Sequence, residues 1–198
     1  MLVQSERSIY LASRSPRRQE LLGQIGVKFQ VMELDVDESI LPGESPRAYV
    51  ERLARAKAEA GWRRVERDNL PRAPVLGADT TVAVDGRILG KPADDREAAA
   101  MLAALSGRLH EVLTALAVKS GSRMESAVSV SEVRFKTLSK EEIAGYVATG
   151  EWQDKAGAYG IQGRAARFAA ELRGSFSGVV GLPLFETAEL LERFGPAA

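Results

Sequence analysis

The segment Val75-Leu76-Gly77-Ala78-Asp79-Thr80-Thr81-Val82-Ala83-Val84 decides the fold class, because a long run rich in β-branched residues predicts a strand. Asp85-Gly86 follows it directly and is a strong hairpin signal, so residues 87–89 are expected to return as a second strand. The middle of the chain therefore predicts antiparallel strand pairing.

Strands and helices are expected to alternate on the N-terminal side of this segment, with further strands and helices on its C-terminal side. The expected strands cover 9–12, 27–31, 75–84, 87–89, 109–118, 127–135 and 167–172. The expected helices run from Pro16 to Gly26, from Pro46 to Ala60, from Asp94 to Gly107, from Ser139 through Val147, and over 184–194. This order predicts a mixed α/β (α+β) domain with a central mixed sheet.

Three local features refine this expectation. Gly61 is expected to end the second helix, and the polar, arginine-rich residues 62–74 are interpreted as a surface helix end plus a loop. The apolar alternation changes parity between Val130 and Val133, which predicts a bulge near Ser131. No linker-like stretch is present, so residues 1–198 are expected to form one domain.

Composition excludes several classes of function. The 198 residues carry 27 Lys plus Arg and 27 Asp plus Glu, and a neutral chain is a poor general binder of nucleic acid or membrane surfaces. With no Cys, disulfides and thiolate nucleophiles are excluded, and with one His a structural zinc site is not expected. Any metal is expected to be a hard cation such as magnesium or manganese. The N-terminus has no signal-peptide pattern, and no apolar run approaches membrane-spanning length, so the cytoplasm is expected.

Asp79 breaks the rule of its own segment, because aspartate is among the poorest strand formers. On a period of two, it shares a face with the small residues Gly77, Thr81 and Ala83, whereas the other face is the better core face. Asp79 is therefore either a site residue that points into a cleft or an exposed residue of an edge strand.

Lys57 and the stretch Ser13-Arg14-Ser15-Pro16-Arg17-Arg18 also depart from their local pattern. Lys57 lies on the apolar stripe of its helix, so its ammonium either reaches water or meets an anion. Ser15 is the expected N-cap of the first helix. Arg17 and Arg18 in its first turn oppose the helix dipole unless an anion lies there. Free N–H groups and two guanidinium groups suit a phosphate, although a solvated basic turn is the alternative.

Other charged residues leave both a site and a structural interpretation open. Asp35, Asp37 and Glu38 could hold a hard metal or form a solvated loop. Lys91 follows the hairpin, and Lys155 leads into a glycine-rich stretch that lacks the P-loop pattern. His110 has apolar neighbours and is expected to be structural. Cations and carboxylates without a covalent nucleophile suit metal-assisted attack of water on a polyphosphate.

Short motifs follow one another along the chain: SRSPRR (13–18), Glu38, RAKA (55–58), GADT (77–80), GKP (90–92), SG (106–107), DKAGAYGIQG (154–163) and VGLP (180–183). In this order they resemble the Maf-like nucleoside triphosphate pyrophosphatases over nearly the whole chain, from about Ile9 to Phe194. The resemblance implies an elongated two-lobed domain similar to inosine triphosphate pyrophosphatase, a homodimer, and release of pyrophosphate with a divalent cation, magnesium or manganese.

The resemblance also implies roles for individual residues. Asp79 corresponds to the catalytic base and, with Glu38, to the metal ligands. Ser13, Arg18, Lys57 and Lys91 correspond to the residues around the phosphates, and Arg17, Thr80 and Gln162 to those associated with base choice. At these last three positions the chain resembles the branch that acts on dTTP and UTP rather than the 7-methyl-GTP branch. Arg14 departs from many members, which bears only on fine substrate preference.

Two other functions are alternatives to a pyrophosphatase. A nucleotide-binding regulator of cell division would bind without significant turnover, an association that the family carries. A nucleic-acid-binding module is disfavoured by the neutral charge and by the lack of a cluster of aromatic and basic residues.

Overall fold

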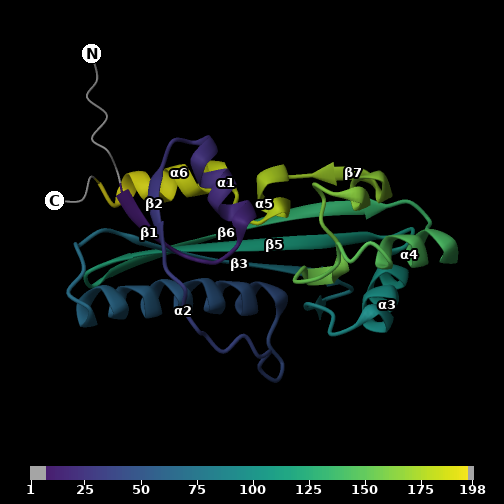
Figure 1. The fold of residues 1–198 in the computed structure, drawn as a ribbon, viewed down its shortest axis with the longest axis horizontal. Coiled ribbons are helices and arrows are strands. Elements are labelled where there is room, and N and C mark those ends of the chain that lie inside the picture. The colour runs from purple at the N-terminus through teal and green to yellow at the C-terminus, as the bar shows by residue number, and fades with distance from the viewer. Residues whose placement is uncertain (1–7, 196–198) are drawn as a thin grey trace, which may run out of the picture.

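A mixed seven-stranded sheet with strand order β2-β1-β3-β5-β6-β7, and with β4 paired to β3, forms the centre of the computed structural model (Figure 1). The structure describes residues 8–195, so Pro196 and the N-terminal residues 1–7, part of the stretch examined for a signal peptide, lie outside it. The strands are β1 Ser8–Ala12, β2 Lys28–Val31, β3 Val75–Val84, β4 Arg87–Leu89, β5 Leu109–Ser120, β6 Arg123–Phe135 and β7 Ala169–Arg173. The helices are α1 Pro16–Gln24, α2 Pro46–Arg67, α3 Asp95–Leu105, α4 Lys140–Val147, α5 Phe176–Val180 and α6 Leu184–Arg193, with 3₁₀ turns at Ala156–Ala158 and Arg164–Phe168.

Strand β3 is the centre of the sheet, and its bounds and those of β4 match the predicted hairpin. It pairs parallel to β1 on one side and antiparallel to β5 on the other. Only Thr80 of its ten residues is partly exposed. The prediction of a mixed α/β fold with a central mixed sheet is confirmed.

Helix α2 covers one face of the sheet, while α1, α5 and α6 lie on the other, and α3 and α4 lie towards one end of the elongated molecule (Figure 1). On the α2 side, Leu53, Ala54 and Ala58 pack against Ala83 and residues of β5. The opposite face has the larger core, which includes Leu76 and Val82 together with residues of α1, α3 and α6. The sequence-based choice of core face in β3 is thus confirmed.

Gly77 lets α2 approach β3 closely. A Cβ atom at this position would lie 2.3 Å from the carbonyl oxygen of Ala54 and 2.6 Å from the backbone nitrogen of Ala58. Because both atoms belong to the helix backbone, any larger residue would push α2 away from the sheet.

The predicted end of the second helix at Gly61 is wrong, because α2 continues to Arg67. Gly61 is buried within the helix, where a Cβ would lie 2.6 Å from Cγ1 of Val75. Trp62 and Val65 continue the apolar stripe and are buried against β1 and β3 residues rather than lying on the surface. The glycine therefore serves close packing and not a helix end.

The predicted bulge near Ser131 is also wrong, since β5 and β6 pair in one constant register from Leu109↔Arg134 to Ser120↔Arg123. The parity change has a different cause: Ser131 faces inward, where its Oγ accepts a hydrogen bond from the backbone of Ser175 at 3.0 Å. The only register shift of β6 recorded for residues 8–195 lies between Arg134 and Phe135, opposite β7. Helix α5, only five residues long, was not predicted. Within residues 8–195, no helix is both long and apolar enough to cross a bilayer.

Replacing Gly77 by alanine is expected to lower the free energy of unfolding by about 1–3 kcal/mol, because the new methyl group overlaps the backbone of α2. Thermal unfolding measures the change. Gly145→Ala is the matched control, since this exposed helical glycine has open space around it and alanine there favours the helix by up to about 1 kcal/mol. Equal melting temperatures for the two variants would contradict the close approach of α2 to β3.

Candidate active site

A cavity of about 570 Å³ opens beside the middle of β3. Strand β1 pairs with β3 only up to Gly77, and β4 pairs with it only from Val82 onward. Residues 78–81 therefore have no strand partner on that side, and the start of α1, the loop before α2 and residues 151–163 surround this gap. The cavity therefore lies where β1 and β4, which pair with the same edge of β3, leave residues 78–81 unpaired between them.

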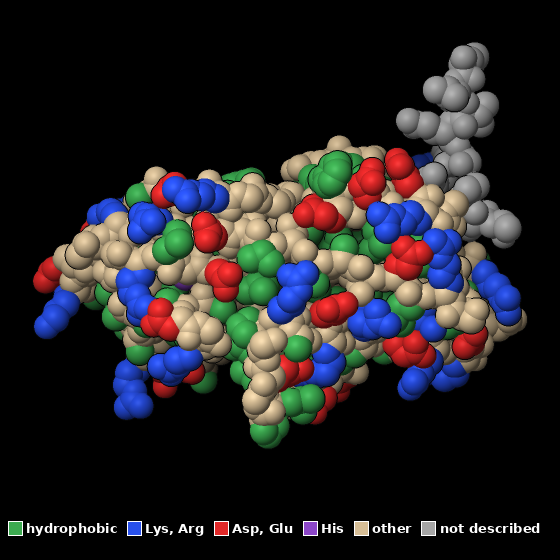
Figure 2. Space-filling model, turned by 180° about the vertical axis from the view of Figure 1, so that it is seen from behind, with side chains coloured by type: hydrophobic (Ala, Val, Ile, Leu, Met, Phe, Trp, Pro, Cys, Tyr) green, Lys and Arg blue, Asp and Glu red, His purple; other side chains and the backbone are tan. Residues whose placement is uncertain are grey.

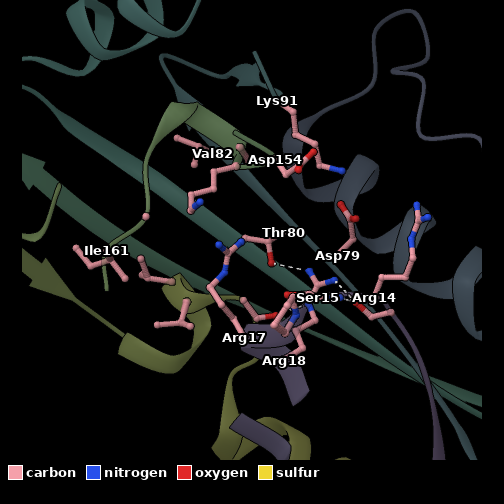
Figure 3. Close-up of a pocket in the computed structure, with 18 of the residues that line it drawn as sticks. Arg14, Ser15, Arg17, Arg18, Asp79, Thr80, Val82, Lys91, Asp154 and Ile161 are labelled. Atoms are coloured by element: carbon pink, nitrogen blue, oxygen red, sulfur yellow. Dashed lines mark hydrogen bonds between the residues drawn. The ribbon is translucent and has the colours of Figure 1, made fainter. Parts of the chain in front are cut away.

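All nine residues singled out for the site line this one cavity. They are Ser13, Arg17, Arg18, Glu38, Lys57, Asp79, Thr80, Lys91 and Gln162. Figure 3 shows Arg17 and Arg18 from α1, Asp79 and Thr80 from β3, and Lys91 around the same space. The structure thus brings together residues that lie up to 149 positions apart in sequence.

Lys57 is bound between two carboxylates. Its Nζ lies 2.6 Å from Oδ1 of Asp79 and 2.7 Å from Oε1 of Glu38. The second oxygen of Glu38 accepts a hydrogen bond from Nζ of Lys91 at 3.1 Å. The lysine on the apolar stripe of α2 therefore meets anions within the cavity instead of reaching towards water.

Burial and charge act in opposite directions on the two carboxyl groups. Burial raises the pKa of Asp79 above its ordinary value, and the charges of Lys57 and Arg18 only partly offset this effect. Burial also disfavours the ionised form of Glu38, but its bonds to Lys57 and Lys91 outweigh burial and lower its pKa to about 2. Glu38 is thus firmly ionised, while Asp79 holds its proton more readily than a free aspartate.

Arg18 is fixed by neutral acceptors on three sides. Its Nε donates to the carbonyl oxygen of Gly181 at 2.8 Å, and its Nη1 and Nη2 donate to the hydroxyls of Ser13 and Thr80, each at 3.1 Å. Because none of these acceptors carries a charge, the positive charge of the guanidinium is available to an anion in the cavity.

The start of α1 adds backbone N–H donors to the part of the cavity around Arg18. Ser15 is at the predicted N-cap position, but its side chain makes no capping bond. The first-turn N–H groups of a helix have no acceptor within the helix, so they suit an anionic ligand. The structure records no hydrogen bond or ion pair between the Arg17 side chain and any other residue of 8–195. On the face shown in Figure 2, by contrast, positive and negative side chains are interspersed.

Of the charged residues left open by the sequence, Lys155 lines the cavity, whereas Asp35, Asp37 and His110 do not. Oδ1 of Asp37 accepts a hydrogen bond from the backbone nitrogen of Ser39 at 2.9 Å. His110 is buried, with its Nε2 2.8 Å from the hydroxyl of Tyr159, and burial lowers its pKa to about 4. It is structural, as expected.

Thr114 does not line the cavity but bonds to a residue that does, and the sequence patterns did not indicate it. It lies on β5 directly opposite Thr80, and the two hydroxyl oxygens are 2.9 Å apart. A threonine within an otherwise apolar strand segment was the available signal. Cross-strand threonine pairs of this kind form hydrogen bonds.

Glu38 and Asp79 are the cavity carboxylates that both bind Nζ of Lys57, while Glu151 and Asp154 also line the cavity. The described part of the chain holds no group of three or more His, Cys, Asp or Glu side chains arranged to bind a metal on their own. Two carboxylates suit a magnesium-type ion whose remaining ligands are water and substrate phosphates. The donor set therefore fits a hard cation that binds together with a phosphorylated ligand.

A buried carboxylate beside a lysine, with a fixed arginine and helix N–H groups close by, is chemically suited to a polyphosphate. Residues 8–194 match the sequence model of the family described as Maf-like protein, so the chain belongs to this family.

Two relatives are similar over almost their full lengths. The dTTP/UTP pyrophosphatase of Aromatoleum aromaticum is 60% identical in an alignment 196 residues long that covers 94% of this chain and 95% of that protein. The dTTP/UTP pyrophosphatase of Nitrosospira multiformis is 58% identical in an alignment 195 residues long that covers 94% of each chain. Among solved structures, the Staphylococcus aureus Ham1 protein is similar over 65% of this chain and 72% of its own, with 15% identity and a TM-score of 0.43.

Glu38→Gln is expected to destabilise the protein at pH 7, and the difference from the unsubstituted protein should shrink as the pH falls from about 4.5 to about 2. The sign follows from the low pKa of Glu38 in the folded state: its ionised form stabilises the fold above its ordinary pKa, and this contribution is lost on protonation. Urea midpoints between pH 7 and pH 3 measure the difference. Glu189→Gln, at an exposed position on α6 with no ion pair to another described residue, controls for loss of a carboxylate. A difference that stays constant with pH would contradict the role of Lys57 and Lys91.

Proposed function

We propose that this protein hydrolyses dTTP and UTP, and modified pyrimidine triphosphates, to the monophosphate and pyrophosphate. The observation that carries the proposal is a single buried carboxylate, Asp79, in a cavity with Lys57, Lys91 and Arg18 around it. The names of the two relatives, at 58–60% identity, support the same activity.

The cations of the cavity hold the triphosphate and offset the charge that develops on it. Arg18 has two N–H groups left after its three bonds to the protein, and these form a fork for phosphate oxygens. The N–H groups of the first turn of α1 and the hydroxyl of Ser13 complete this end. Lys57 and Lys91 neutralise the charge that moves onto the leaving pyrophosphate.

Glu38 and Asp79 would hold a divalent cation, magnesium or manganese, together with phosphate oxygens. Such an ion polarises the phosphoryl group and neutralises charge on it. Both carboxylates bind Nζ of Lys57 in the structure, so Lys57 keeps them on one side of the cavity.

Asp79 orients a water molecule for in-line attack on the α-phosphorus and accepts its proton. The new bond joins the water oxygen to the α-phosphorus, and the bond between that phosphorus and the bridging oxygen breaks as pyrophosphate leaves. A base works best when its pKa approaches the working pH, and burial moves the pKa of Asp79 in this direction.

Arg17, Thr80 and Gln162 are proposed to determine the choice of base. Arg17 and Gln162 line the cavity, and the Gln162 amide offers both a donor and an acceptor, as the edge of uracil or thymine requires. A glutamate there would only accept when ionised, which suits the donor edge of guanine.

The proposal extends to the assembly and location of the protein. Residues 1–198 act as one Maf-like domain in a cytoplasmic homodimer, without a nucleic-acid or membrane partner. The net charge of zero supports the absence of such partners. A nucleotide-binding regulator of cell division without turnover is the alternative, and turnover separates the two functions.

Purified protein with magnesium or manganese should release pyrophosphate from UTP and dTTP faster than from purine triphosphates. Removal of the metal with EDTA and dialysis should abolish turnover, and added magnesium or manganese should restore it. A panel of nucleoside triphosphates with pyrophosphate detection measures both effects. Binding of UTP without pyrophosphate release would favour the regulator, and undiminished turnover after chelation would refute the metal.

Asp79→Asn is expected to lower kcat by about 10²–10⁴-fold, because asparagine keeps the shape but cannot accept the proton. The melting temperature at pH 7 should be equal or higher. With the pKa of Asp79 raised in the folded state, its ionisation costs stability as the pH rises, and asparagine removes this cost. Asp37→Asn, outside the cavity, should keep its turnover. A near-normal rate for Asp79→Asn would refute the assignment.

Gln162→Glu is expected to lower kcat/KM for UTP and dTTP by at least about tenfold relative to purine triphosphates, since a donor to the pyrimidine edge is lost. Gln153→Glu is the matched control, because it adds the same charge to the cavity wall at another position. The ratio of kcat/KM for UTP to that for GTP is measured for both variants. If the ratio falls equally in both, charge and not base recognition is responsible.

A further inference from the structure

A chain of hydrogen bonds connects Arg18 to the backbone of α5 through two threonines. Nη2 of Arg18 donates to Oγ1 of Thr80 at 3.1 Å, and the hydroxyls of Thr80 and Thr114 are 2.9 Å apart. Oγ1 of Thr114 then donates to the carbonyl oxygen of Gly178 at 2.7 Å. Figure 3 shows the first of these bonds beside Asp79.

The direction of every bond in this chain is fixed by counting hydrogens. A threonine hydroxyl has one hydrogen, and a carbonyl oxygen can only accept. Thr114 therefore gives its hydrogen to Gly178 and must accept from Thr80. The hydrogen of Thr80 is used in this way, so a lone pair of its oxygen faces the N–H group of Arg18.

We propose that Thr114 is a positioning residue that holds Arg18 in its phosphate-binding orientation by fixing the hydroxyl of Thr80. The inference rests on the proposed function only in taking Arg18 as a phosphate ligand. Thr114 is 1% exposed and does not line the cavity, so it acts on a ligand only through its neighbours. Arg18 is thus connected to Gly178 of α5 through the two threonines and directly to Gly181, the residue that follows α5.

The same count of hydrogens limits what Thr80 can do to a base. Its hydrogen is committed to Thr114 and one lone pair to Arg18, so it can accept one further hydrogen bond but cannot donate one. Thr80 therefore cannot recognise a base carbonyl through its hydroxyl while this chain of bonds is intact. Thr80 therefore influences substrate choice by fixing the position of Arg18.

Thr114→Val removes the hydroxyl at almost unchanged shape and frees the hydrogen of Thr80 to turn towards Arg18. With UTP as substrate, kcat/KM is expected to fall about tenfold, the size of effect that follows when a hydrogen bond to a charged group is weakened. Thr114→Ser keeps the hydroxyl and should restore kcat/KM to within about threefold of the unsubstituted protein.

Two controls separate positioning from a merely structural role. Thr187→Val also removes a buried hydroxyl that donates to a carbonyl oxygen at 2.7 Å, that of Pro183, but has no bond to Arg18 or Thr80. It should change thermal stability without changing kcat/KM. In an Arg18→Lys background, which lacks the fork, Thr114→Val should cost less than about twofold, because the two residues act as a pair.

The inference is overturned if Thr114→Val costs about tenfold in both backgrounds, or if it leaves kcat/KM unchanged as Thr187→Val does. Lack of UTP turnover by the unsubstituted protein would instead count against the proposed function. In that case, the affinity for inorganic pyrophosphate, measured by calorimetry on the same variants, gives the same comparison. Weaker binding in Thr114→Val with rescue in Thr114→Ser supports positioning, and equal affinities refute it.

Discussion

The close contact between α2 and β3 is the constraint on which the rest of the site depends. Gly77 leaves room for the helix backbone, so that Lys57 on α2 reaches Asp79 two residues further along the strand. The same ammonium binds Glu38, which fixes the loop before α2 on the cavity wall. Without this contact, Lys57 on α2 could not bind both Asp79 on β3 and Glu38 in the loop before α2.

The site places charge where folding alone would favour apolar groups. Burying a charged pair costs desolvation energy that its mutual attraction does not reliably offset. The raised pKa of Asp79 reflects this cost of burial. At the more exposed Glu38, the bonds to Lys57 and Lys91 outweigh burial and lower the pKa. The large core on the other face of the sheet supplies the stability that tolerates such an arrangement.

The sequence predicted those parts of the fold that local patterns determine. The bounds of β3 and β4 were correct because the strand and its Asp85-Gly86 turn carry their own signals. The end of α2 was wrong because Gly61 has a tertiary role, and α5 is too short to show a period. Asp79 and Lys57 were indicated by the sequence because each is a charged residue at a position that favours an apolar one. That Lys57 binds both Asp79 and Glu38 depends on register and packing, which local patterns do not show. Thr114 was not predicted because its role depends on its hydrogen bond to Thr80 on the neighbouring strand, which the sequence does not show.

The gap between β1 and β4 along β3 has a consequence for how this chain can change in length. Side chains alternate between the faces of a strand, so a deletion or insertion of one residue within 78–81 would move Asp79 or Thr80 to the opposite face. The turn between β5 and β6 at residues 121–122 is exposed and lies outside the cavity lining, so added length there leaves the gap unaltered. Tolerance to insertions should therefore be lowest in this segment of four residues.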